Sequence, residues 1–287
     1  MLESRGEKTF YAFNYVILAA AALITLYPFL YVLSASLSSP KAVVMGDVFL
    51  YPIDITLDAY SAVLKEKGIL TGYANTLFYT VVGTIVSLVL TVCGAYALSK
   101  KRLMGRKLFN ILISITLVFQ AGMIPTYLNF RELHLLDSRL AIIIGFAIST
   151  FNVIILRTFF QSIPDEIEEA ARIDGASDFS VLMRIVLPLS KASLATIGLF
   201  YAVSRWNGYF WAMVLLKDPN KIPLQVLLNR LVVQMKPSDN MLADSAFSVG
   251  ETLIYATIVV AILPIVAVYP FIQKYFVKGV MIGSVKG

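Results

Sequence analysis

Hydrophobic residues in this chain of 287 residues fall into six long runs that are separated by polar segments. Each run has roughly the 20 residues that an α-helix needs to cross about 30 Å of hydrocarbon. The pattern predicts an all-α, polytopic membrane protein with six transmembrane helices. The predicted spans are residues 11–33, 75–99, 108–128, 140–160, 191–216 and 251–271.

The polar segments differ in length and charge. Residues 34–74 and 217–250 are long and punctuated by proline, so we expect two external loops, the first with short helices of its own. The segment 100–107 is short and rich in Lys and Arg, which is typical of cytoplasmic loops. We therefore expect both termini and the segment between spans four and five to be cytoplasmic. The predicted parts are a cytoplasmic N-terminus (1–10), a six-helix membrane domain (11–272) that includes the cytoplasmic loop 161–190, and a cytoplasmic tail (273–287).

The second predicted span carries a face of small side chains. Gly83, Ser87 and Thr91 are spaced at i, i+4 and i+8, which places them on one side of a helix. Small residues let another helix approach closely. In lipid the hydrophobic effect does not drive helices together, so their association depends on such close packing. This face predicts a helix–helix contact rather than a ligand site.

Composition narrows the class of protein. Hydrophobic residues make up 58% of the chain and charged residues only 15%, whereas soluble domains have about 25% charged residues. The net charge of +6 is concentrated in the segment 100–107, so it does not indicate nucleic-acid binding. One cysteine, Cys93, and one histidine, His134, leave no disulfide framework and no His/Cys zinc site. The spans lack the cluster of ionisable residues that an ion-coupled transporter or membrane enzyme needs.

The stretch 162–188 is the most charged long segment of the chain. Ser162 is a candidate N-cap, and acidic residues crowd the next two turns, where they favour the positive end of a helix. Gly175 is the expected stop of a helix over 164–174. A second short helix should begin near Ser177, bury one apolar face (Val181, Leu182, Ile185, Val186) and end at Pro188.

A helix this short is marginal in isolation, so something must hold it. Its Ala170 and Ala171 form a shallow surface that another protein could approach closely. Two interpretations stay open: the helix merely connects two spans and rests on its own membrane domain, or it docks on a separate partner. The acidic, alanine-rich face favours the partner.

The spacing Glu169-Ala170-Ala171, three residues, Gly175, nine residues, Ile185-x-Leu187-Pro188 resembles the EAA motif of ABC importer permeases. The segments 163–177, 206–211, 273–279 and 283–287 are similar to the carbohydrate-uptake branch, the relatives of the smaller maltose permease subunit, and most of all to its polysaccharide and uronate oligosaccharide group. The resemblance implies a type I ABC importer fold and a binding-protein-dependent carbohydrate importer. An ABC permease for a polyamine or a small anion is the alternative.

The resemblance also implies partners. The EAA helix would be a coupling helix that seats in a cytoplasmic ATPase subunit, through Asp165, Glu166, Glu169, Ala170, Ala171, Asp174 and Gly175. ATP and Mg²⁺ would be bound by two ATP-binding cassette subunits, because this chain has no G-x-x-x-x-G-K-[ST] motif and needs no cofactor or metal of its own. A second homologous permease subunit and an extracytoplasmic solute-binding protein, which would meet the loop 217–250, complete the expected assembly in the bacterial cytoplasmic membrane.

Sugar recognition requires aromatic faces for the rings and amide groups for the hydroxyls. The candidates for the substrate pathway are Gln120, Asn152, Trp206, Asn207, Tyr209, Phe210 and Trp211. Aromatic residues also mark membrane interfaces, and Asn or Gln can join helices, so structural roles compete for each of them. Arg205 is about 21 Å along the fifth span at 1.5 Å per residue, which predicts a position near the outer boundary.

Overall fold

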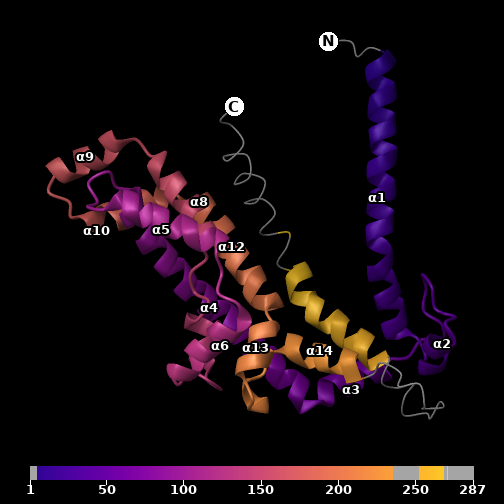
Figure 1. Ribbon diagram of the computed structural model, residues 1–287. Coiled ribbons are helices and arrows are strands. Elements are labelled where there is room, and N and C mark those ends of the chain that lie inside the picture. Colours follow the sequence, from indigo (N-terminus) through magenta and orange to yellow (C-terminus); the bar gives the residue numbers. More distant parts are fainter. Residues whose placement is uncertain (1–4, 235–251, 268–269, 271–287) are drawn as a thin grey trace. The chain divides into compact units, whose positions relative to one another are not determined.

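The computed structural model describes residues 5–234, 252–267 and 270, and in these ranges all regular structure is helical (Figure 1). The predicted all-α class is therefore confirmed for the described part of the chain. The chain divides into two compact units, one made of residues 1–70 and 228–264, the other of residues 71–227 and 265–287. The predicted tail 273–287 lies outside the described residues.

The first unit is built on α1 (Arg5–Leu37), which is apolar all round and exposed from Gly6 to Leu30. Such a helix belongs in hydrocarbon or against other membrane helices. Its last turn packs on α2 (Pro40–Met45) through Ala35, Ala42 and Val43, and α3 (Asp58–Lys65) is joined to it by a 2.7 Å hydrogen bond between the Ser36 and Tyr60 hydroxyls. The expected short helices within residues 34–74 are thereby confirmed.

The second unit begins in α4 (Lys67–Ser99), which packs on α12 (Lys191–Asn207) through its small-residue face. Ser87 and Thr91 are fully buried, and the Thr91 hydroxyl lies 2.7 Å from the hydroxyl of Tyr201. A Cβ at Gly83 would lie 3.1 Å from Nε of Arg205. The predicted helix–helix contact is confirmed, and the missing side chain of Gly83 makes room for a guanidinium.

Three of the predicted spans are broken rather than continuous. The third predicted span is α5 (Arg106–Val118) followed by α6 (Met123–Glu132), bent by 117°. The fourth is α7 (Arg139–Ile144) followed by α8 (Thr150–Gln161). The fifth is α12 followed by α13 (Phe210–Leu215). The predicted spans over 108–128, 140–160 and 191–216 are therefore not single continuous helices.

Proline and glycine explain the breaks. A continuous helix would press the ring of Pro125 against the carbonyl of Ala121, whereas the first turn of α6 tolerates a residue without an N–H. At Gly145 a Cβ would collide with the ring of Phe130, so only glycine lets α6 and the end of α7 approach this closely. Gly208 adopts an extended conformation that ends α12.

The number of spans follows from how these breaks are counted. Among the described residues, α1 and α4 are long and apolar enough to cross a membrane, and up to four spans result if two bent pairs, α5 with α6 and residues 178–189 with α12, each count as one. Two shorter apolar helices follow, Leu224–Val233 within α14 (Leu224–Gln234), and Thr252–Ala267. The count of six stays a prediction. The segment 217–250, expected to be a polar loop, instead starts with η2 (Pro219–Lys221) and the apolar α14.

Candidate functional site

The acidic stretch forms α9 (Asp165–Ile173), within one residue of the predicted bounds. Gly175 has φ +84°, a conformation that side chains disfavour, and the N–H of Ala176 donates to the carbonyl of Ala171 at 2.9 Å. The predicted glycine stop is confirmed. The predicted cap was wrong: Ser162 ends α8, where its hydroxyl donates to the carbonyl of Phe159, and Pro164 precedes the first turn of α9.

A second helical segment follows as predicted but continues past the expected end. The Ser177 hydroxyl caps α10 (Asp178–Val181), which runs on through a wide turn, η1 (Leu182–Val186), into α11 (Leu187–Leu189). It ends at Leu189, one residue after the predicted end at Pro188. The chain then bends by 84° between Leu189 and Lys191.

The two short segments are mounted on the second unit by an apolar core. Val181, Leu182 and Val186 are buried as predicted, and Ala171 packs against the same cluster. The remaining members come from α4, α8 and α12, namely Val92, Ala95, Tyr96, Leu156, Phe160, Ile197 and Tyr201. This core holds α9 at one end of the unit, as Figure 1 shows.

Ion pairs join the same segments to the basic loop after α4. Lys100 pairs with Glu168, Lys101 with Asp165 at 2.6 Å, and Arg102 with Asp178. Arg172 adds weaker pairs to Glu168 at 3.5 Å and to Asp178 at 3.4 Å. The hydrogen bonds from Lys101 and Arg102 lower the pKa values of the Asp165 and Asp178 carboxyls.

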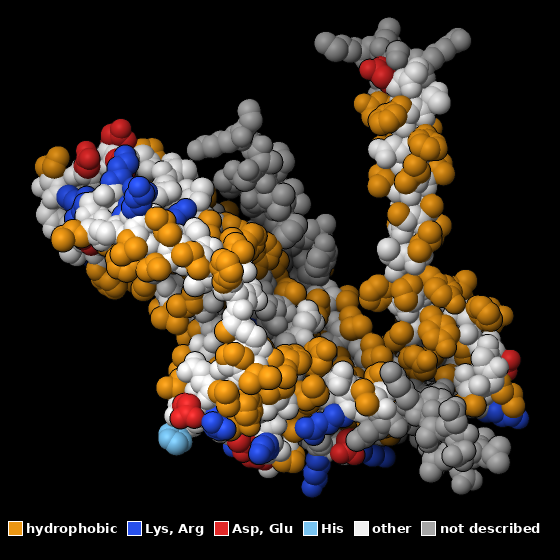
Figure 2. All heavy atoms as spheres, viewed as in Figure 1, with side chains coloured by type: hydrophobic (Ala, Val, Ile, Leu, Met, Phe, Trp, Pro, Cys, Tyr) orange, Lys and Arg blue, Asp and Glu red, His pale blue; other side chains and the backbone are white. Residues whose placement is uncertain are grey.

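These contacts show that the loop 100–107 and the stretch 162–178 lie at the same end of the second unit, where Figure 2 shows both signs of charge together. They also correct the sequence interpretation. The acidic residues do not all point towards a separate partner, since Asp165, Glu168 and Asp178 hold the helix on its own membrane domain.

Most of α9 remains exposed: within it only Glu168 is buried, and Ala171 and Arg172 are partly buried. Of the seven predicted coupling residues, Glu166, Glu169, Ala170, Asp174 and Gly175 are exposed, Asp165 is exposed but paired, and Ala171 is partly buried. Two large apolar residues that the sequence analysis missed lie exposed here: Ile173 (86%) and Phe179 (68%). The sequence did contain a signal for this: a large apolar residue at a position of a polar helix that does not face the core. We call Glu169, Ala170, Ile173 and Phe179 the exposed α9 face.

A second candidate site is a pocket of about 580 Å³ around the breaks between α7 and α8 and between α12 and α13. Five of the seven predicted pathway residues line it: Asn152, Asn207, Tyr209, Phe210 and Trp211. The other lining residues are Ile142, Phe146, Ser149, Phe151, Phe200, Tyr201, Ser204, Arg205, Gly208 and Ala212. The sequence thus identified the region, although no periodicity predicted that the breaks would open it.

The pocket wall combines aromatic rings with amides. The Trp211 ring stacks on Phe146 with centroids 5.2 Å apart, and Phe210 meets it edge-on at 5.3 Å. Two predicted residues lie elsewhere. Trp206 is buried and packs edge-on against Tyr73 at 6.0 Å, and Gln120 lies in the break between α5 and α6, where it does not line this pocket.

Arg205 was not among the predicted site residues, yet it organises the pocket wall. Its guanidinium donates to the carbonyls of Ile142, Ile143 (2.9 Å) and Phe146 (3.0 Å), and to the Ser87 hydroxyl at 3.2 Å. The last carbonyls of a helix have no partner within it, so a cation there is favourable. Arg205 therefore caps α7 from the side. An arginine inside an apolar run was the signal that could have found it.

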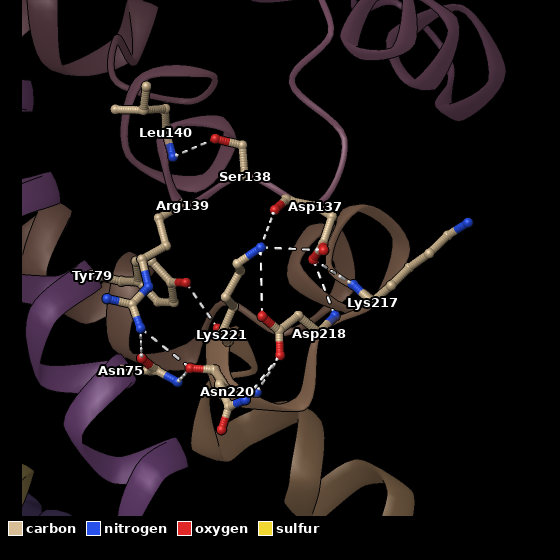
Figure 3. A network of polar contacts seen from close by, with 10 residues as sticks. All are labelled: Asn75, Tyr79, Asp137, Ser138, Arg139, Leu140, Lys217, Asp218, Asn220 and Lys221. Carbon is tan, nitrogen blue, oxygen red and sulfur yellow. Dashed lines mark hydrogen bonds and ion pairs between the residues drawn. The ribbon is translucent and has the colours of Figure 1, made fainter.

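A third polar network fixes the chain after α13 (Figure 3). The Asp137 carboxylate accepts the backbone N–H groups of Lys217 and Asp218, both at 3.0 Å, and pairs with Lys221 at 3.2 Å. These hydrogen bonds lower the pKa of Asp137. Arg139 donates to the Asn75 side chain and to the Asn220 carbonyl, both at 3.2 Å. The start of the segment 217–250 is thereby tied to the turn before α7 and to α4.

No group of three or more His, Cys, Asp or Glu side chains within the described ranges is placed to hold a metal ion. The exposed α9 face is suited to contact with a protein, and the pocket is suited to a small polar molecule with rings.

Comparison with known proteins identifies the family. The family model of binding-protein-dependent transport system inner membrane components matches residues 67–282. This chain belongs to that family. The resemblance to ABC importer permeases is confirmed, and such permeases are not themselves enzymes. With its apolar helices, this permease is a multi-pass protein of the cytoplasmic membrane.

Two relatives from Bacillus subtilis (strain 168) align over nearly their whole length. Protein LplC is 41% identical over 100% of this chain and 98% of its own. The polygalacturonan/rhamnogalacturonan transport system permease protein YtcP is 43% identical, over 95% of this chain and 96% of its own.

A solved structure supports the fold of the permease. It is the crystal structure of a bacterial ABC transporter involved in the import of the acidic polysaccharide alginate, and one of its chains superposes with a TM-score of 0.88. That chain is 48% identical to this permease, and the match covers 96% of this chain and 99% of that one. The type I importer fold implied by the sequence resemblance is supported at the level of the whole chain.

Proposed function

We propose that this permease is a membrane-spanning subunit of an ATP-driven importer of oligosaccharides, those with uronate units in particular. The names of two similar proteins support the substrate class, since polygalacturonan and alginate are both acidic polysaccharides. The observation that carries the proposal is the pocket between the broken helices. Its aromatic rings suit pyranose faces, and its Asn152 and Asn207 amides suit hydroxyls.

The alternative substrates fit this pocket less well. A polyamine is a cation and would meet Arg205, the one Lys, Arg, Asp or Glu side chain among the described lining residues. A small anion would be compatible with Arg205 but would leave the stacked rings of Phe146 and Trp211 without a role. The volume of about 580 Å³ lies within the range of about 300–1,000 Å³ that is usual for ligand sites.

We further propose that the exposed α9 face docks on a cytoplasmic ATPase subunit. Glu169 would offer a carboxylate, Ala170 a shallow floor, and Ile173 and Phe179 apolar area that is otherwise left in water. Large exposed apolar residues beside polar ones are a common sign of a protein interface. In this assembly ATP and Mg²⁺ belong to two ATPase subunits, and a second permease and a solute-binding protein complete it.

The core beneath α9 suggests how movement reaches the pocket. Val181 and Val186 pack on the same cluster as Ile197 and Tyr201 of α12, and Tyr201 also lines the pocket. Ion pairs from Glu168 and Asp178 hold the loop that follows α4 to the same two helical segments. A displacement imposed on α9 would therefore pass to α12 as a rigid-body movement and change the pocket at its far end.

Reconstitution in liposomes tests the proposal. The complete importer is expected to take up oligogalacturonate, and not putrescine or inorganic phosphate. Glu169→Lys reverses a charge on the exposed α9 face, and we expect uptake to fall at least roughly tenfold with loss of substrate-stimulated ATP hydrolysis, since interface hot spots cost 2 kcal/mol or more. Membrane assembly should be unchanged.

Glu132→Lys is the matched control, because Glu132 is an exposed acid at the end of α6. We expect it to transport normally. Normal uptake together with normal ATPase stimulation in Glu169→Lys would contradict the docking assignment. Uptake of putrescine or phosphate in place of oligogalacturonate would contradict the substrate class.

A further inference from the structure

The charge of Arg205 has no counter-charge in the described structure. Its hydrogen bonds go to three carbonyls and one hydroxyl, which are neutral groups. Within residues 5–234 and 252–267 the described ion pairs join other residues, and none involves Arg205. These neutral acceptors receive hydrogen bonds from Nη1 and Nη2 of Arg205 but leave a full positive charge at the wall of the pocket.

An uncompensated charge in a poorly solvated place is costly, so its presence calls for a reason. Holding the end of α7 is one reason, but a neutral donor such as Gln or Asn could hydrogen-bond carbonyls without the cost of a charge. The second reason is the pocket itself. Arg205 lines it together with Ser204, Asn207 and aromatic rings that carry no charge. The field of this guanidinium acts on whatever enters.

We propose that Arg205 is a specificity-determining residue that makes the pocket prefer oligosaccharides with carboxylates over neutral oligosaccharides of the same size. This inference rests on the proposed function and adds the group that discriminates. A sugar carboxylate near the guanidinium would supply the missing negative charge, while its ring faces the Phe146–Trp211 stack. A neutral sugar could use the rings and amides but would leave Arg205 uncompensated.

The test compares two substrates with the same sugar skeleton: trigalacturonate, and its fully methyl-esterified form, which carries no charge and one added methyl group per carboxyl. The complete importer is reconstituted with its binding protein, and each substrate is supplied above the concentration that saturates that protein, so that the ratio of uptake rates reports the membrane step. We expect wild type to favour the acid. In Arg205→Gln we expect the uptake rate of the acid to fall roughly tenfold and that of the ester less than about twofold. The variant removes one partly desolvated charge interaction that only the acid can make.

Arg139→Gln is the matched control. Arg139 also donates to a carbonyl and to a side-chain oxygen, yet it does not line the pocket, so the variant removes the same charge elsewhere. We expect it to keep the wild-type ratio of acid to ester. An equal loss for both substrates in Arg205→Gln would make Arg205 a purely structural residue and overturn the proposal.

A second pair of variants leaves the contacts of Arg205 in place. Ser204 is exposed and lines the same pocket, so Ser204→Glu adds a negative charge there, and Ser204→Gln adds similar bulk without charge. We expect Ser204→Glu to reduce uptake of the acid roughly tenfold relative to Ser204→Gln, with the ester unchanged. Equal effects of the two variants would overturn the proposal even if Arg205→Gln fails to assemble.

The two proposals fail differently. If wild type takes up neither trigalacturonate nor its ester, the proposed function is wrong. If wild type takes up both at equal rates, and Arg205→Gln does the same, the importer carries oligosaccharides but Arg205 does not select among them.

Discussion

The two candidate sites of the second unit use charge in opposite ways. At the α9 end, Lys100, Glu168, Arg172 and Asp178 neutralise one another and fix a short helix on its membrane domain. In the pocket, the single charge of Arg205 meets only neutral groups. Paired charges build structure, and the side chains left available to a partner there are those of the exposed α9 face. The unpaired charge is available to a ligand.

The largest expected effect breaks the first half of this comparison. Glu168 is only 6% exposed and pairs with both Lys100 and Arg172. Glu168→Gln leaves two cations without their shared carboxylate, and removal of one partner from a buried pair typically costs about 3–5 kcal/mol. We expect the free energy of local opening of α9 to fall by about 3 kcal/mol. The fall is measured as loss of amide hydrogen-exchange protection over residues 162–178.

Glu166→Gln serves as the control for Glu168→Gln, because Glu166 is an exposed acid in the first turn of the same helix. Its exchange protection should match wild type. Unchanged protection in Glu168→Gln would mean that the apolar core alone holds α9, and that the ion pairs are incidental.

The next effect tests the broken helices that shape the pocket. Gly145 lies just after α7, and a Cβ there would collide with the Phe130 ring and the Ala141 carbonyl. Gly145→Ala is expected to destabilise the permease by about 2 kcal/mol, since overpacking costs about 1–3 kcal/mol. Because Arg205 donates to carbonyls of this segment, we also expect slower uptake, measured in liposomes.

Gly94→Ala is the matched glycine variant. Gly94 lies within α4, and a Cβ there would meet nothing within 4 Å. Alanine favours a helix over glycine by about 1 kcal/mol, so thermal stability should be equal to wild type or higher. Equal behaviour of the two glycine variants would show that the contact at Gly145 relaxes freely and does not define the break.

How much of the fold and of the two sites could be predicted depends on how far apart in the sequence the interacting residues lie. The α9 helix was predictable within one residue because its stop, at Gly175, is local. The buried face of the next segment was predictable from its spacing. The pairing of Lys100 with Glu168 was not, since 68 residues separate them and the sequence does not show which charges meet.

The pocket shows the same limit. The aromatic and amide residues from 207 to 211 drew attention by their composition, but Trp206 lies near the end of α12 and packs against Tyr73, outside the pocket. Hydropathy averages over Pro125, Gly145 and Gly208, so it predicted single spans where the chain turns. Arg205 was placed near the outer boundary, but its role was missed because its partners are backbone carbonyls, which leave no pattern in a sequence.

The smallest expected effect concerns an exposed ion pair at the α9 end, between Arg102 and Asp178. Arg102 and Asp178 are both about half exposed, so this ion pair should contribute about 0.5 kcal/mol or less. The folded pKa of Asp178 is lowered, so its contribution is present above the unfolded value of about 3.9 and is lost as the pH falls through the lower folded value. Between pH 5 and 8 we therefore expect no change in hydrogen-exchange protection of residues 175–181, while a rise in salt from 50 to 500 mM should reduce it slightly, to the level of Asp178→Asn. A pH-dependent loss of exchange protection within that range would mean that another titrating group controls the segment. Salt should have no comparable effect on the hydrogen bonds that Arg205 makes with carbonyls.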